Sequence, residues 1–190
     1  MKTDEIKVSG SIDQVNLALT QAEKVAEYKN LPNKSALHLR LLTEEVMGMM
    51  RAITGDVEGK FWIEDEDNVF QLHLQVITNI DEEQREQLLS ASTSGKNEAA
   101  KGLMGKIRTF FEPMEGVPMF YGLDMGVYTD VVWSMRDYQE QVKQYIAEKR
   151  DGAKEAWDEL EKSVIFHIAD DVKVSIYGRK VEMVIIKKME

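Results

Sequence analysis

The chain has 190 residues and a formal net charge of −10, from 34 acidic against 24 basic side chains. A surface this acidic argues against nucleic acid or an anionic membrane as a partner and suits a basic protein partner. The absence of cysteine excludes disulfides, thiolate catalysis and cysteine-ligated zinc.

The first third of the chain is predicted to contain a short edge strand and two helices. Residues 3–9 fit the strand, and a capping-box pattern from Ser11 to Gln14 opens the first helix. The second helix, from Ser35 to Gly55, carries a broad apolar stripe with the periodicity of a helix. Its members are Leu39, Leu42, Val46, Met49, Met50 and Ile53. Such a stripe is typical of a helix that covers a sheet.

Two neighbouring glutamates of this helix have different predicted surroundings. Glu44 points away from the apolar stripe and is expected in solvent, whereas Glu45 sits at the edge of the stripe. A carboxylate at such an edge is costly unless it is paired or used. Glu45 is therefore either a rim residue paired with a nearby lysine or arginine, or a site carboxylate that faces a cleft.

The next segment predicts an antiparallel strand after a turn. Residues 65–68 have turn composition, and in residues 69–78 apolar and polar side chains alternate. Alternation of this kind indicates one buried and one solvent-exposed face. His73 falls on the polar side and is expected to be exposed. His38 and His167 are isolated, and none of these histidines shows the spacing of metal ligands.

The middle of the chain is predicted to be helical with long connections. A short helix begins at Asp81, a small-residue loop spans 90–97, and a further helix spans 98–111. Residues 113–134 show no period and are expected to form a long ordered loop or lid.

The last part of the chain predicts more helices and a final hairpin. Residues 135–150 are helical, a further helix carries Trp157, Leu160 and Val164, and two strands flank Gly178. Strands that come as hairpins predict an α/β fold. We expect a two-layer sandwich, with a mixed, mostly antiparallel sheet and helices on one face.

Common catalytic patterns are weak in this sequence. Segment 102–106 has glycines and a lysine, but not the spacing of a phosphate-binding loop. The paired carboxylates Asp65/Asp67 and Asp170/Asp171 fall in predicted turns, where solvated capping is the commoner role. Several methionines fit either core filling or an adaptable binding groove. They are Met47, Met49, Met50, Met104, Met114, Met119, Met125 and Met135.

The order of elements resembles that of the Bergerat-type, histidine-kinase-like ATPases. The resemblance is carried by the helix with the sequence LRLLTEEVMGMM before a hairpin, and by a glycine-containing helix after a small-residue loop. Among these proteins, the bacterial anti-sigma serine kinases are the most similar in size. The resemblance covers roughly residues 1–112 and 168–188 of a single expected domain, 1–190. Residues 113–167 are an insertion relative to the family.

The resemblance assigns roles to particular residues, and several of the family's residues are missing. Glu45 matches the general base, but Met49 stands where a magnesium-binding asparagine is expected, and a thioether is a poor ligand for Mg²⁺. The long strand ends without the family's adenine-admitting glycines, with Asn79 or Asp81 as remnants. The family has a glycine–threonine pair before its last strand. Here Gly178 is followed by Arg179, so the threonine is missing.

The phosphate-side glycine box is the best preserved of the family's motifs. Gly95, Lys101, Gly102 and Gly105 match its lid and helix start and would lie near the phosphates of a bound nucleotide.

We therefore expect a bacterial regulatory protein-binding module of the anti-sigma type, with weak or lost nucleotide binding, no cofactor and no metal. Its expected partner is a protein, neither nucleic acid nor membrane, and a homodimer stays open. No signal-like or membrane-spanning run is seen, which predicts a cytoplasmic location. One alternative is an active serine/threonine kinase that uses ATP and Mg²⁺ with Glu45 as base. Another is a pocket reused for a different small molecule, closed by residues 113–134.

Overall fold

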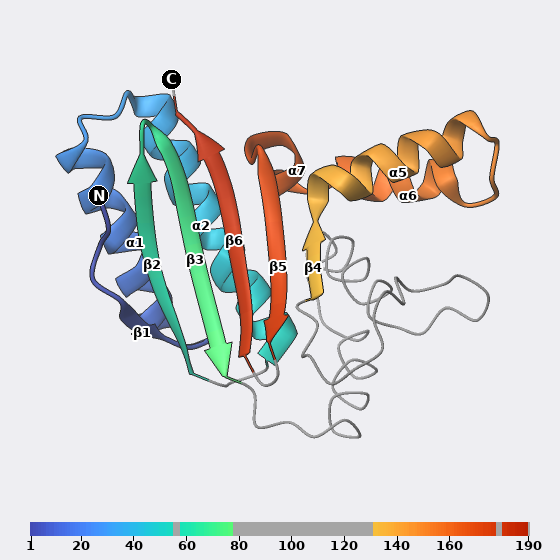
Figure 1. Ribbon diagram of the computed structural model, residues 1–190. Helices are drawn as coiled ribbons and strands as arrows, with labels where there is room; N and C mark the ends of the chain where they lie inside the picture. Colours follow the sequence, from blue (N-terminus) through green and yellow to red (C-terminus); the bar gives the residue numbers. More distant parts are fainter. Residues whose placement is uncertain (55–57, 78–130, 178–179, 190) are drawn as a thin grey trace.

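A computed structural model describes residues 1–54, 58–77, 131–177 and 180–189 (Figure 1). The strands are β1 (Ile6–Val8), β2 (Gly59–Glu66), β3 (Val69–Ile77), β4 (Val131–Ser134), β5 (Asp171–Tyr177) and β6 (Lys180–Lys188). The helices are α1 (Ile12–Tyr28), α2 (Asn33–Thr54), α5 (Met135–Ala147), α6 (Ala153–Glu161) and α7 (Val164–Ile168). The helices expected to begin at Asp81 and to span 98–111 lie outside the described residues.

The strands form one six-stranded sheet in the order β1-β2-β3-β6-β5-β4. Helices α1 and α2 lie against one face, so the predicted two-layer α/β architecture is confirmed (Figure 1). Every pair of neighbouring strands among the described residues is antiparallel, so the mostly antiparallel character is confirmed, and no parallel pair occurs in this part of the sheet. Two of these five pairs, β2–β3 and β5–β6, join strands that follow each other directly in the chain, without a helix between them.

The hydrophobic core lies between α1, α2 and the covered face of the sheet. The described members of the apolar stripe of α2 are buried, as predicted: Leu39, Leu42, Val46, Met49 and Met50. They meet inward-facing sheet residues such as Phe61, Phe70, Leu72 and Ile185. A period of 3.6 in the helix and of two in the strands therefore places these residues on the same interface.

Helix α1 confirms the first predicted helix but not its predicted cap. Ser11 occupies the N-cap position with extended backbone, yet its side chain makes no capping hydrogen bond. Its hydroxyl oxygen instead accepts a hydrogen bond from the Ser9 hydroxyl at 3.2 Å. The local serine pair competes with the cap.

The β2–β3 turn is shorter than the predicted 65–68. Strand β2 runs to Glu66, and only Asp67 and Asn68 connect the strands, both with positive φ (50° and 63°). Two such residues match the type I′ turn that joins twisted hairpins. Asp65 is therefore a buried strand residue, paired with Lys29 and the Met1 ammonium group, and its predicted role as a solvated cap was wrong.

Two glycines give opposite predictions for substitution by alanine. A Cβ on Gly59 would lie 3.0 Å from the Gln75 carbonyl oxygen, 3.1 Å from Val76 Cγ2 and 3.2 Å from Met50 Cε. The backbone contact cannot relax cheaply, so we expect G59A to lower the free energy of unfolding by about 1–3 kcal/mol. Gly48 is exposed in α2, and a Cβ there would have nothing within 4 Å. We therefore expect G48A to raise the free energy of unfolding by about 1 kcal/mol.

Urea denaturation of the two variants beside the unmodified protein checks this pair. Equal stability of G59A and the unmodified protein would show that β3 and α2 can both move away from the added methyl group without cost.

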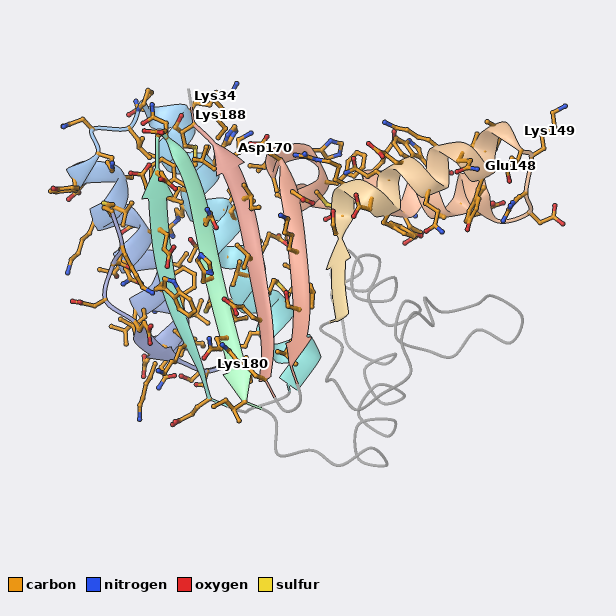
Figure 2. All side chains as sticks on the ribbon, in the orientation of Figure 1. Lys34, Glu148, Lys149, Asp170, Lys180 and Lys188 are labelled. Atoms are coloured by element: carbon orange, nitrogen blue, oxygen red, sulfur yellow. The ribbon has the colours of Figure 1, made fainter. Side chains whose placement is uncertain are left out.

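The C-terminal half adds one edge strand and a helical hairpin. Strand β4 pairs with β5 at the edge of the sheet, within the region predicted to be an insertion. The pair α5–α6, the arm from here on, projects away from the sheet, with Glu148 and Lys149 near its tip (Figures 1 and 2). The predicted helix over 135–150 is confirmed, whereas the next one divides into α6 and α7 around Ser163. The final hairpin is confirmed as β5–β6.

Asp171 attaches the arm to the sheet. Its carboxylate accepts hydrogen bonds from the Val172 amide (2.8 Å), the Arg136 amide (3.1 Å) and the Ser134 hydroxyl (3.2 Å). It is buried at 5% exposure, so the predicted solvated carboxylate was wrong. Asp170 is exposed and pairs with Lys187 at 3.1 Å.

No helix in the described part of the chain is long and apolar enough to cross a membrane.

Candidate functional site

Helix α2 positions Glu45, the residue on which the catalytic alternative depends. The apolar stripe fixes the rotation of the helix, which leaves Glu45 half-buried at the rim while Glu44 is exposed. Burial raises the pKa of the Glu45 carboxyl, and the negative charge of Glu44 raises it further. The Glu45 carboxyl therefore holds its proton more readily than a carboxyl in water.

The expected ion pair of a rim glutamate is not formed within the described residues. Arg40, five residues before Glu45, instead contacts Glu23 of α1 and lies 3.6 Å from Glu44. Glu45 therefore has no cation beside it among the described residues, and its role as a site carboxylate that faces a cleft stays a prediction.

This half-buried carboxyl predicts a pH-dependent stability. Its pKa is higher in the folded than in the unfolded chain, so folding is favoured fully below its ordinary value of 4.5 and less as pH rises. The variant E45Q lacks this penalty and should be more stable than the unmodified protein at pH 7, by less than about 1 kcal/mol because the group is partly screened by water. Thermal unfolding at pH 4 and pH 7 measures the difference.

E44Q serves as the matched control for this pH series. It keeps the burial of Glu45 and removes only the smaller contribution of the Glu44 charge, so its effect should have the same sign as that of E45Q and be smaller. Lower stability of E45Q than of the unmodified protein at pH 7 would instead reveal a cationic partner of Glu45.

Met49 follows Glu45 by one helical turn and faces the interior. Its side chain is 1% exposed and belongs to the hydrophobic core. The described members of the predicted methionine groove are buried as well. They are Met47, Met49, Met50 and Met135. For these residues, core filling is the observed role.

The other residues assigned by the resemblance lie outside the described residues. They are Gly95, Lys101, Gly102 and Gly105, together with Asn79 and Asp81. The lid expected over 113–134 is described only from residue 131, where β4 begins. The described structure thus places Glu45 and Met49 and does not test their partners.

One hollow on the described surface does not include Glu45 among its lining residues. It has a volume of about 590 Å³ and sits between the end of α1 and the start of α2. Its lining residues are Glu23, Ala26, Glu27, Asn30, Leu31, Asn33, Ala36, Leu37 and Arg40.

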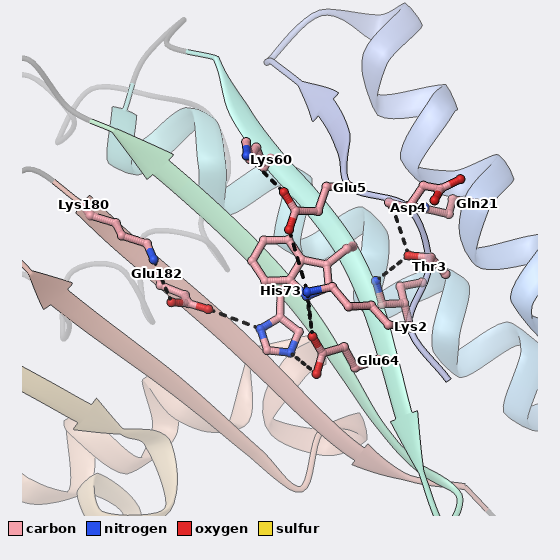
Figure 3. A network of polar contacts seen from close by, with 12 residues as sticks. Lys2, Thr3, Asp4, Glu5, Gln21, Lys60, Glu64, His73, Lys180 and Glu182 are labelled. Atoms are coloured by element: carbon pink, nitrogen blue, oxygen red, sulfur yellow. Dashed lines mark hydrogen bonds and ion pairs between the residues drawn. The ribbon is translucent and has the colours of Figure 1, made fainter.

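A second cluster lies on the face of the sheet opposite α1 and α2, which no described helix covers and which is called the open face from here on (Figures 1 and 3). Sequence patterns did not predict this cluster. His73 is only 9% exposed, because its ring stacks on Trp62 with centroids 4.7 Å apart. The expectation of an exposed His73 was therefore wrong. Trp62 and His73 are directly paired across β2 and β3, a register that the two-residue turn sets. Recognition of that turn in the sequence would have revealed the pair.

Metal ligands do not gather in the described structure. Within its residues there is no group of three or more histidine, aspartate or glutamate side chains suited to a metal ion.

Comparison with known proteins leaves the family open. No family model matches the chain, and no curated protein or solved structure matches it significantly.

Proposed function

We propose that this protein is a regulatory protein-binding module of the anti-sigma type, on a histidine-kinase-like scaffold that has lost its nucleotide chemistry. The observation that supports this most directly is the burial of Met49 in the core. If α2 is the family's metal-binding helix, its metal-binding position is now a packing residue, and Mg²⁺ lacks an oxygen ligand there.

The surface chemistry supports a protein partner. The chain carries a net charge of −10, which suits a basic protein surface and opposes anionic ligands such as nucleotides unless lysines or arginines gather locally. An acidic module of this kind acts by binding to the basic surface of its partner, without catalysis.

Thermal unfolding with and without ATP and Mg²⁺ tests the loss of nucleotide binding. We expect an unchanged melting temperature at millimolar nucleotide, because a ligand stabilises only a protein that it binds. A rise of several degrees that depends on Mg²⁺ would overturn the proposal. Unfolding with ADP and with Mg²⁺ alone separates a nucleotide effect from an ionic one.

An active ATP-dependent serine/threonine kinase is the second candidate, and one observation favours it. Glu45 is half-buried, has a raised pKa and has no cation among its described neighbours, as suits a general base. The test is transfer of labelled phosphate from ATP to a co-encoded partner protein. Transfer lost in E45Q and kept in E44Q would establish this candidate, and absence of transfer to any such partner would reject it.

A further inference from the structure

The open face of the sheet holds a histidine between two carboxylates from different strands. His73 of β3 has Nδ1 at 3.3 Å from Glu182 Oε1 on β6, and Nε2 at 3.9 Å from Glu64 Oε2 on β2 (Figure 3). These strands flank β3 on its two sides. The imidazole therefore lies between acids that the chain brings together from positions 109 residues apart for His73 and Glu182.

Glu64 is held in its charged form by its surroundings. Its Oε1 accepts a hydrogen bond from Trp62 Nε1 at 2.9 Å and lies 3.2 Å from Lys2 Nζ. The Trp62 hydrogen bond lowers the pKa of the Glu64 carboxyl, and Lys2 and His73 lower it further. Lys2 also lies over the Trp62 ring, 4.8 Å from its centroid.

The charged groups around His73 come from three described segments on this face. The N-terminal segment provides Lys2 and Glu5, strand β2 provides Lys60 and Glu64, and strand β6 provides Lys180 and Glu182. Lys60 pairs with Glu5 at 3.0 Å, and Lys180 lies 3.7 Å from Glu182. Each carboxylate at the ring therefore also contacts a lysine: Glu64 contacts Lys2, and Glu182 contacts Lys180.

The two protonation states of His73 fit this site unequally. Nε2 is buried and has no hydrogen-bond partner in the described structure. A neutral imidazole with its proton on Nδ1 satisfies Glu182 and leaves the Nε2 lone pair facing a carboxylate, whereas an imidazolium donates from both nitrogens. Histidine is the side chain that changes charge between pH 5 and 8.

We propose that His73 is a proton-responsive bridge on the open face of the sheet. On protonation, Nε2–H moves into hydrogen-bond distance of Glu64 and joins β2, β3 and β6 through a carboxylate–imidazolium–carboxylate contact. This contact uses Glu64 Oε2, while Oε1 of the same carboxylate accepts from the Trp62 indole and lies beside Lys2, so the Trp62 hydrogen bond responds to it. The open face consequently changes its charge when His73 gains a proton, and the hydrogen bond of the Trp62 indole changes with it.

The test is a pH titration by nuclear magnetic resonance of protein labelled with ¹⁵N-tryptophan, from pH 5 to pH 8. We expect the indole Nε1–H signal of Trp62, assigned by its loss in W62F, to shift with the same midpoint as the His73 ring protons. In H73Q the Trp62 signal should be flat with pH. In E182Q and E64Q, which keep the histidine, the midpoint should move to lower pH because one carboxylate no longer favours the imidazolium.

H167Q is the matched control. His167 is exposed and its Nε2 contacts the Glu161 carbonyl oxygen at 2.6 Å, so its removal should leave the Trp62 titration unchanged. A Trp62 signal that does not titrate in the unmodified protein would overturn the proposal. So would a midpoint that E182Q and E64Q leave in place.

Discussion

Replacing Met49 by asparagine is expected to lower the free energy of unfolding by about 3 kcal/mol. Met49 is 1% exposed inside the hydrophobic core. An asparagine there leaves a cavity and buries an amide among apolar neighbours, and each of these effects costs stability. Urea denaturation followed by circular dichroism measures the loss. We also expect M49N to gain no binding of ATP with Mg²⁺, because a single oxygen ligand does not rebuild a nucleotide site.

M49L is the control for this substitution. It keeps the apolar character and nearly the volume of methionine, so its cost should stay below about 1.5 kcal/mol. If M49N were as stable as M49L, position 49 would have access to water or a polar partner. That result would favour the nucleotide-binding alternative over the protein-binding module.

Replacing Asp171 by alanine is expected to cost about 2–3 kcal/mol and to loosen the arm. The carboxylate is 5% exposed and accepts from the Val172 and Arg136 amides and the Ser134 hydroxyl. Alanine leaves these donors without their partner, and a buried donor without a partner costs more than the hydrogen bond itself contributes. Denaturation measures the stability, and limited proteolysis should cut residues 135–161 faster in D171A.

D158A is the control for D171A. Asp158 is exposed on α6, and its removal should change stability by less than about 0.5 kcal/mol and leave the proteolysis rate unchanged. Equal proteolysis of D171A and D158A would show that the helices of the arm hold their position without the Asp171 contacts.

The sequence predicted what depends on local periodicity. The stripe of α2 and the alternation of β3 each repeat over several turns or residues, so Leu42 and Phe70 were placed in the core from pattern alone. The final hairpin around Gly178 followed from the same logic. Element boundaries were less accurate, because a helix such as the one predicted through Trp157 and Val164 can break where tertiary contacts favour it.

The buried polar residues could not be predicted in this way. Asp65 is buried because Lys29 lies beside it, and His73 is buried because Trp62 and Glu182 surround it. These partners are fixed by strand register and by helix placement, neither of which a local pattern contains. For the candidate site, the position of Glu45 at the rim was predictable from the helical wheel. The absence of a described cation beside it was not.

The arm extends well beyond the sheet and is attached to it at one end (Figure 1). Helix α5 has 13 residues, which at about 1.5 Å per residue extends roughly 20 Å from its base at Ser134. A rotation of about 10° at that base therefore moves the tip by roughly 3 Å. A force at Lys149, near the tip, acts on the Asp171 contacts across the whole length of the arm. A force applied at the tip of the arm is therefore transmitted to β4 and β5 at its base.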